Sequence, residues 1–475
     1  MNPADSTRDA LALLTGPDAP GLVQLAITGR ADARLPDFTA DIVAVHHRPG
    51  ADTSVRYDVR YRAIAHDRDT SVVVTDSFLL STGRAARGGE GVVELRRGDD
   101  VLYAWRFPGD PALPALAAAL DPSTVGRWLG APVVTAREAD ADGPDAARDP
   151  AAFAAAVVTH RPLRRATVRV CARGEEHFVK TVRRREADAL VRRHRVAAEA
   201  GIGPQIVAEP MPGTVVLRRA GGENLASTLA AARDGDPFPA PEGFIALLER
   251  LPRTALSLPR RAPWSERLDF HARAASDAHP DLAGRLDRIR DRVETLLASA
   301  PTGPVVPVHG DPSVTNVFVE AGAPAGFIDL DSLGPGYRVD DLATVLAHLA
   351  VLRPLAPETY PQADATVEAW HRAFEAQREI DPVALRARVA AVLVSLVAGS
   401  PQGQAEARVG LAEAWCRLAA AADDDVPRPS SSPRTVRRHE AITLLAHRPL
   451  QHPHPAPAES ANGPRPAPQT VRRPA

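Results

Sequence analysis

Two neighbouring stretches of the chain decide its fold: HGDPSVTN at residues 309–316 and GFIDLDSLGPGYRVDDLA at residues 326–343. The first stretch follows the short apolar run VVPV at 305–308, and the second begins with another largely apolar run. Short apolar runs bounded by glycine and proline are typical of buried strands joined by turns. The polar residues of both stretches are therefore predicted to lie on loops at the ends of buried strands.

Three of these polar residues carry oxygen atoms suited to a metal ion. Asp311 and Asn316 stand five positions apart on the first loop, and Asp329 ends the later strand. Mg²⁺ prefers such oxygen ligands and usually completes its shell with substrate phosphates. In phosphoryl transfer, one carboxylate accepts the proton of an attacking hydroxyl, while an Asn oxygen and a second carboxylate hold the metal. The spacing predicts this chemistry, although each residue alone is also a common turn former or strand-end cap.

A single lysine, Lys180, stands among 57 basic residues that are otherwise all arginine. Lysine places a compact charge on a flexible stem and fits where the planar fork of arginine does not. Strand-like segments at 157–161, 166–171 and 177–182 predict an antiparallel meander with Lys180 on its third strand. In the template for phosphoryl transfer, a lysine on the third strand contacts the α- and β-phosphates. Chance is the alternative explanation for its position.

Together these motifs resemble the aminoglycoside phosphotransferase and choline kinase family, whose pattern runs HGDxxxxN, then IDxx, then a glycine-containing turn and DLA. The resemblance covers residues 155–425. It implies a protein-kinase-like α+β fold with two lobes, an antiparallel-sheet N-lobe and a mostly helical C-lobe. It also implies ATP and Mg²⁺ as cofactors and a small-molecule hydroxyl acceptor as the partner.

The resemblance implies a role for each matching residue. Asp311 takes the position of the catalytic base, and Lys180 that of the phosphate-binding lysine. Asn316 and Asp329 take the positions of the Mg²⁺ ligands. His309 matches a residue that braces the catalytic loop. Two further matches are Asp341, which orders that loop, and Asp331, a possible ligand of a second metal ion.

The N-lobe departs from the family pattern in two ways. No G-x-G-x-x-G loop precedes Lys180, and the corresponding turn, at 160–165, offers arginines and backbone amides instead. The glutamate that pairs with the lysine is also ambiguous, because Glu186 opens the following helical segment and Glu199 nearly closes it; we favour Glu186. Leu217 to Arg219 falls where the hinge of the family binds adenine, so Leu217 and Arg219 are predicted to contact the nucleotide.

The length of 475 residues predicts two to four domains at roughly 100 to 200 residues each. The predicted parts are an N-terminal α+β domain at 1–135, an acidic linker at 136–154, the N-lobe at 155–220, the C-lobe at 221–425 and a disordered Pro-rich tail at 426–475. A faint repeat aligns VHHRPGADTSVRY at 45–57 with VTHRPLRRATVRV at 158–170. If it is not chance, the N-terminal domain holds a degenerate copy of the N-lobe sheet.

The charge and composition of the chain argue against nucleic acids and membranes as binding partners. The net charge of −2 provides no field for nucleic acid or an anionic membrane, and no apolar run approaches the roughly 20 residues of a membrane span. Two cysteines and the absence of a secretory leader favour the cytoplasm. The acceptor stays open among aminoglycosides, sugars and amino-alcohols. A nucleotide-binding interaction protein without catalysis is the alternative function.

Overall fold

The computed structural model describes residues 10–47, 52–64, 71–97, 100–130, 153–172, 174–232 and 238–424. The predicted tail at 426–475 and most of the predicted linker lie outside these ranges. No helix within the described ranges is long and apolar enough to cross a membrane.

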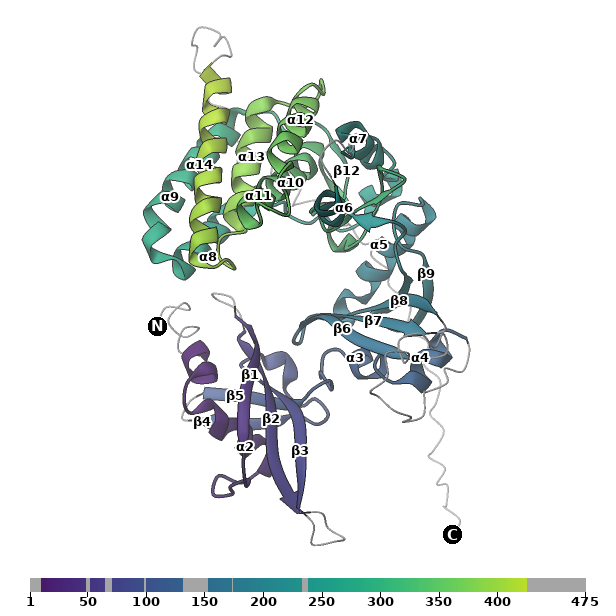
Figure 1. Cartoon of the computed structure of the whole chain (residues 1–475), viewed down its shortest axis with the longest axis vertical. Coiled ribbons are helices and arrows are strands. Elements are labelled where there is room, and N and C mark those ends of the chain that lie inside the picture. Colours follow the sequence, from purple (N-terminus) through teal and green to yellow (C-terminus); the bar gives the residue numbers. More distant parts are fainter. Residues whose placement is uncertain are drawn as a thin grey trace, which may run out of the picture. The chain divides into compact units, whose positions relative to one another are not determined.

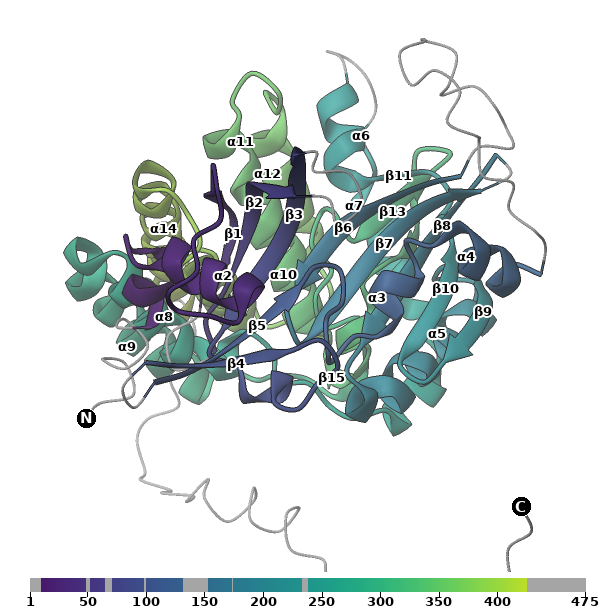
Figure 2. The same ribbon diagram turned by 90° about the horizontal axis from the view of Figure 1, so that it is seen from below.

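The N-lobe is a five-stranded antiparallel sheet with the order β6-β7-β8-β10-β9 (Figure 2). Its strands are β6 (Ala154–Arg161), β7 (Arg165–Ala172), β8 (Glu175–Val182), β9 (Ile206–Met211) and β10 (Thr214–Arg218). The predicted three-strand meander is confirmed, because buried and more exposed positions alternate along β7 as its sequence requires. Strand β9 was not predicted.

Helices cover this sheet on the side where its valines are buried. The short helices α3 (Ala115–Ala118) and α4 (Pro122–Trp128) bury Leu116 and Val125 against valines of β7, β8 and β10. Residues assigned by sequence to the N-terminal domain therefore complete the core of the N-lobe. Helix α5 (Ala187–Glu199) follows β8 and ends before Gly201, as predicted.

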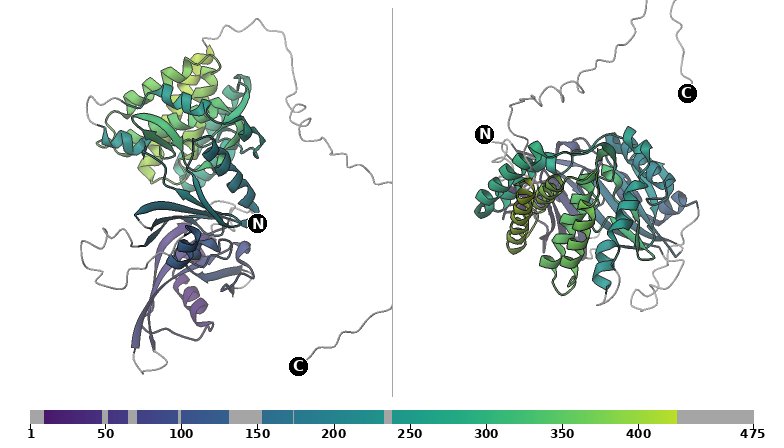
Figure 3. Two further views of the ribbon diagram at one scale, coloured as in Figure 1. Left: turned by 90° about the vertical axis from the view of Figure 1, so that its right-hand side faces the viewer. Right: turned by 90° about the horizontal axis from the view of Figure 1, so that it is seen from above.

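The C-lobe is mostly helical. In Figures 1 and 3 the green and yellow helices α10 to α14 lie side by side, and α10 and α13 are buried along almost their whole length. Its helices are α6 (Leu225–Ala231), α7 (Pro241–Glu249), α8 (Leu268–Ala278), α9 (Ala283–Ser299), α10 (Arg338–Ala350), α11 (Leu352–Leu355), α12 (Ala363–Glu375), α13 (Pro382–Ser395) and α14 (Gln402–Asp424).

Short strands in the C-lobe carry the two deciding stretches. Strand β12 (Val305–Val308) pairs with β15 (Gly334–Tyr337), and β13 (Val317–Glu320) pairs with β14 (Ala323–Phe327) and β11 (Glu223–Asn224). The expected strand at 325–330 ends earlier, at Phe327, because Asp329 adopts a left-handed backbone conformation with φ 54° and ψ 54°. That conformation cannot continue a strand.

The N-terminal domain packs helix α2 (Ala19–Thr28) on a second five-stranded sheet. Its strands are β1 (Thr39–His46), β2 (Ser54–Ile64), β3 (Ser71–Ser81), β4 (Val93–Arg97) and β5 (Asp100–Arg106), in the order β1-β2-β3-β5-β4. This order is the same as in the N-lobe, and the segments 45–57 and 158–170 both span the connection between the first two strands. The internal repeat stays a prediction, which this shared order supports.

The predicted α+β class is confirmed, with an antiparallel-sheet N-lobe, a mostly helical C-lobe and an extra N-terminal α+β domain. Short 3₁₀ turns connect several elements, namely η1 (Arg84–Ala86), η3 (Arg184–Glu186), η4 (Arg253–Ser257), η5 (Ser265–Arg267), η6 (Pro280–Leu282) and η7 (Leu330–Ser332).

Candidate active site

The loop after β12 is held by a buried carboxylate on helix α10. Asp341, in the first turn of α10, accepts hydrogen bonds from the backbone N–H groups of His309 (2.7 Å) and Gly310 (2.8 Å). Gly310 has φ 84°, and a Cβ there would lie 2.8 Å from Cβ of Ser332. Glycine is therefore required at this position, and Asp341 orders the loop as the resemblance implies.

The ring of His309 connects the two deciding stretches. Its Nε2 lies 2.9 Å from the carbonyl oxygen of Ile328, and its Nδ1 lies 3.2 Å from the backbone N–H of Asp311. Complete burial lowers the pKa of His309 to about 4, so the ring is neutral near pH 7. A neutral ring with Nε2–H donating and Nδ1 accepting satisfies both bonds. His309 is thus a structural brace.

Asp311 follows this brace at the site where both stretches meet. Burial raises the pKa of Asp311 to about 6, and repulsion from Asp329 adds to the rise, while Arg165 and Arg267 oppose it. The side-chain amide of Asn316 donates a hydrogen bond of 3.0 Å to the backbone oxygen of Asp311. The structure therefore brings Asp311, Asn316 and Asp329 together, as the spacing predicts.

Lys180 reaches the same site from strand β8. Its Nζ lies 2.9 Å from Oδ1 of Asp329 and 2.6 Å from Oδ1 of Asp331. Burial alone would lower the pKa of Lys180, but the two carboxylates outweigh burial and raise it. Burial opposes ionisation of Asp331, yet Lys180 and Arg165 hold its pKa well below the usual range. The ammonium and both carboxylates are therefore charged.

Arg165, the first residue of β7, completes this group of charges. Its Nη1 donates a hydrogen bond to Asp331 and lies 3.5 Å from Oδ1 of Asp329. From the sequence alone, Arg165 belongs to the turn at 160–165, and Asp331 is only a possible metal ligand. Both belong to the four-residue cluster Arg165, Lys180, Asp329 and Asp331, which we call the charge cluster.

Helix α5 does not supply the carboxylate expected beside Lys180. Glu186 precedes the first residue of α5, and its Oε1 lies 3.7 Å from Nε of Arg185. Within the described ranges, the carboxylates that bond to Lys180 are Asp329 and Asp331. The pairing favoured for Glu186 is therefore wrong in this structure, because Glu186 stands at the helix start rather than along the face toward Lys180.

A histidine of α5 faces the charge cluster instead. His194 is almost fully buried, and burial followed by the charge of Lys180 lowers its pKa to about 3. It is therefore neutral at physiological pH. A neutral ring leaves both carboxylates of the cluster to balance Lys180 and Arg165.

The predicted hinge lies at the end of strand β10. Leu217 is buried and pairs with Phe178 of β8, whereas the side chain of Arg219 forms ion pairs with Glu176 (3.1 Å) and Glu223 (2.8 Å). The adenine contacts of Leu217 and Arg219 stay a prediction.

The turn before Arg165, where a glycine-rich loop is expected, is fixed by the N-terminal domain. Asp110, which is only 2% exposed, accepts hydrogen bonds at Oδ2 from the backbone N–H of Leu163 (2.8 Å), and His160 Nε2 lies 3.0 Å from the same oxygen. Oδ1 of Asp110 accepts from the N–H of Ala112 at 2.9 Å. Asp110 stands in a proline- and glycine-rich segment, where aspartate is an ordinary turn residue, so sequence reasoning missed it.

Leu163 itself is anchored in the same domain. It has φ 60°, is buried and packs with Leu79, Tyr103 and Trp105. A non-glycine residue in the left-handed region is held by its surroundings. The turn is thus fixed by burial and by Asp110 rather than by glycines.

Residues 157–375, a little under half of the chain, match the model of the phosphotransferase enzyme family. No curated protein is significantly similar to the chain in sequence.

Several solved structures are similar to this chain. A choline/ethanolamine kinase family protein from Mesorhizobium loti is 16% identical, with 54% of this chain and 88% of that chain covered and a TM-score of 0.39. A thermostable mutant of the aminoglycoside phosphotransferase APH(4)-Ia is 16% identical, with 56% and 95% covered and a TM-score of 0.38. APH(3'')-Id from Streptomyces rimosus is 19% identical, with 51% and 92% covered and a TM-score of 0.33. At TM-scores this low, the likenesses carry no weight for the chemistry of this chain.

Proposed function

We propose that this protein transfers the γ-phosphoryl group of ATP to a hydroxyl group of a small molecule. The observation that carries the proposal is the hydrogen bond between Lys180 and Asp329, which joins the N-lobe to the stretch that contains Asp311. A cation from the sheet and acidic groups from the C-lobe loops are the two halves of a phosphoryl-transfer site.

Each residue has a defined task in the proposed reaction. Asp311 accepts the proton of the acceptor hydroxyl as the acceptor oxygen attacks the γ-phosphorus and the bond to the bridging oxygen of ADP breaks. Lys180 and Arg165 compensate the negative charge of the phosphates. Catalysis then consists of positioning and charge compensation, as expected for phosphoryl transfer.

The residues present fit Mg²⁺. Asn316 and Asp329 supply an amide oxygen and a carboxylate, and the amide nitrogen of Asn316 is already committed to the backbone oxygen of Asp311, which orients the amide. These hard oxygen donors suit Mg²⁺ bound with the phosphates. When bound, the ion would neutralise phosphate charge.

The surroundings of Asp311 favour an acceptor of the sugar or neutral polyol type over a polycationic aminoglycoside. The guanidinium of Arg267 lies close enough to lower the pKa of Asp311, and its Cζ lies 4.5 Å from the ring centre of Trp264. A positive charge beside the base repels a cationic acceptor. The N–H donors of this guanidinium suit neutral hydroxyl groups, which accept hydrogen bonds.

A phosphorylation screen with labelled ATP tests the proposal directly. The panel contains neutral sugars, amino-alcohols and aminoglycosides, and each is compared between the parent and Asp311→Asn. We expect turnover with a neutral hydroxylated acceptor that Asp311→Asn lowers by about 10³-fold or more, since the carboxylate acts only as the reaction proceeds. Preferred turnover of aminoglycosides would contradict the acceptor class.

The alternative, a non-catalytic nucleotide-binding protein, gives a different result in the same screen. It predicts that ATP binds, that Lys180→Ala weakens this binding, and that no compound is phosphorylated in an Asp311-dependent way. The position of Asp311, a buried carboxylate beside the charge cluster, favours catalysis, because nucleotide binding alone requires no proton acceptor there.

A further inference from the structure

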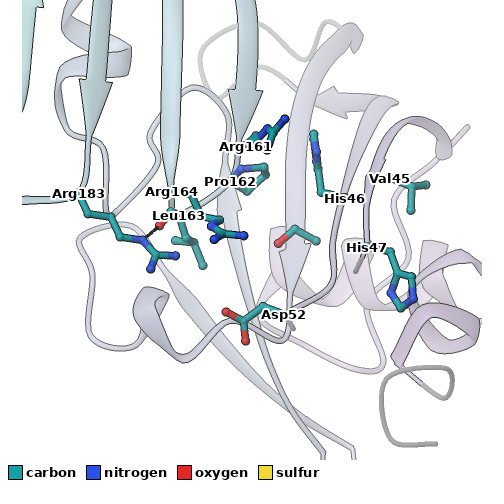
Figure 4. Close-up of a pocket in the computed structure, with 10 residues that line it drawn as sticks. Val45, His46, His47, Asp52, Arg161, Pro162, Leu163, Arg164 and Arg183 are labelled. Carbon is teal, nitrogen blue, oxygen red and sulfur yellow. Dashed lines mark hydrogen bonds between the residues drawn. The ribbon is translucent and has the colours of Figure 1, made fainter. Parts of the chain in front are cut away.

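A second polar pocket lies on the N-terminal side of the turn that precedes Arg165. It has a volume of about 540 Å³ and is formed by the end of β1, the start of β2, the β6–β7 turn and the residue after β8 (Figure 4). Its walls include His46, His47, Asp52, Arg161, Arg164 and Arg183. The volume lies within the range of small-molecule sites. None of the charge-cluster residues lines this pocket.

Positive charge exceeds negative charge in this pocket. Three arginines line it, and Asp52 is the one carboxylate among the lining residues. Burial lowers the pKa of Arg183, and the neighbouring charges of Arg185 and Arg164 lower it further, while Glu186 and Asp52 partly oppose them. The net effect of these neighbours is a lowered pKa, and an anion bound beside Arg183 and Arg164 would relieve their mutual repulsion.

The other side of the pocket carries two histidines, His46 and His47, and positive charges lie near His46 as well. Burial lowers the pKa of His46, and the nearby His160 and Arg161 add to the effect. Nδ1 of His47 lies 2.9 Å from the hydroxyl of Thr53, which holds this ring in place. Both rings can donate a hydrogen bond while neutral.

The side chain of Arg183 is held in position by a hydrogen bond in the absence of a ligand. Nε of Arg183 donates to the backbone oxygen of Leu163, the contact drawn dashed in Figure 4. Its two terminal nitrogens have no hydrogen-bond acceptor in the described part of the chain. Leu163 is fixed in turn by Asp110. A preorganised guanidinium binds an anion at a smaller cost in side-chain entropy.

We propose that this pocket binds the phosphate group of a small phosphorylated molecule, separately from the nucleotide site. The guanidinium groups of Arg164 and Arg183, with several N–H donors each, match the oxygens of a phosphate dianion better than the two oxygens of a carboxylate. Arg164 of the β6–β7 turn lines this pocket, while its neighbour Arg165 joins the charge cluster. The bound phosphate therefore contacts the turn that precedes the active site.

Isothermal titration calorimetry on the full chain tests the site, with glucose 6-phosphate and inorganic phosphate as probes. Saturating ADP and Mg²⁺ are present throughout, so that the nucleotide cleft is filled. We expect one phosphate to bind per chain, and Arg183→Gln and Arg164→Gln each to weaken binding at least tenfold. Arg184→Gln is the matched control, because it removes the same charge from an exposed arginine that does not line the pocket.

Arg164→Gln keeps the test decisive if Arg183→Gln disturbs the fold, since the structure shows no side-chain hydrogen bond of Arg164 in the described ranges. Succinate should bind at least tenfold more weakly than phosphate. Equal binding of succinate, or unchanged binding after both substitutions, would overturn the proposal. These outcomes do not test the proposed phosphotransferase activity, which is tested separately by the phosphorylation screen with Asp311→Asn.

Discussion

The site depends on the compact shape of one side chain, that of Lys180. Lys180 is the one lysine of the chain, and its Nζ bridges Asp329 and Asp331 from a buried position on β8. An arginine there would carry a longer, planar head into a space that already holds the guanidinium of Arg165. Arginine would thus preserve the positive charge at position 180 but not the compact shape of the lysine ammonium group.

Lys180→Arg should therefore lower turnover by about 10²- to 10⁴-fold while the protein stays folded. Steady-state kinetics with the best acceptor of the screen measure the loss, and circular dichroism checks the fold. Arg184→Lys, an exchange in the opposite direction at an exposed position, serves as the control. Kinetics equal to those of the parent would remove Lys180 from the phosphate site.

The pH profile tests the other residue-scale claim. Burial raises the pKa of Asp311 to about 6, so below that pH the carboxyl group is protonated and cannot accept a proton from the acceptor. We expect kcat/KM to fall about tenfold per pH unit below pH 6 and to be flat just above it. Arg267→Gln removes an opposing cation and should move this limb to higher pH. A limb that stays in place would contradict the charge of Arg267 acting on Asp311.

At the scale of elements, the sequence predicted the strands and helices whose formation depends on residues close together in the chain. The meander β6–β8 follows from the alternation of its residues, and α5 ends before Gly201 as the sequence indicates. Strand β15 has the sequence GPGY, three of whose four residues are of types depleted in strands, and it forms because β12 pairs with it. The partners of Lys180 were missed for a similar reason, since 151 residues separate it from Asp331.

The β6–β7 turn leads to the element-scale prediction. Asp110→Asn keeps the size of the side chain but removes the charge that accepts from Leu163 and Ala112, leaving buried donors poorly satisfied. We expect a loss of about 1 to 3 kcal/mol in the free energy of unfolding, and a higher KM for ATP than for the parent. Urea denaturation and ATP titrations measure the two effects. Asp58→Asn, on an exposed position of β2, is the control, and a KM unchanged by Asp110→Asn would contradict the role of the turn.

At the scale of the whole molecule, one arginine of α5 ties the N-lobe to the catalytic lobe. Nε of Arg193 donates to the backbone oxygen of Leu333 at 2.9 Å, and Nη2 donates to that of Pro259 at 2.8 Å. Arg193 is buried, so these carbonyl groups have little access to water. The fork of a guanidinium serves both acceptors at once.

Arg193→Lys should cost about 1 to 3 kcal/mol of unfolding free energy, because one ammonium cannot reach both carbonyl oxygens with the same geometry. Arg192→Lys, on the exposed face of the same helix, provides the matched comparison. Thermal and urea unfolding measure the difference. Equal stability of the two variants would show that the lobes do not depend on this bond.

The packing of Leu163 has a consequence for a fragment that lacks the N-terminal domain. The side chain of Leu163 packs among Leu79, Tyr103 and Trp105, so a fragment limited to residues 157–375 would expose this leucine to water. A fragment that keeps Leu163 covered would therefore have to include the N-terminal domain, because Leu79, Tyr103, Trp105 and Asp110 all belong to it.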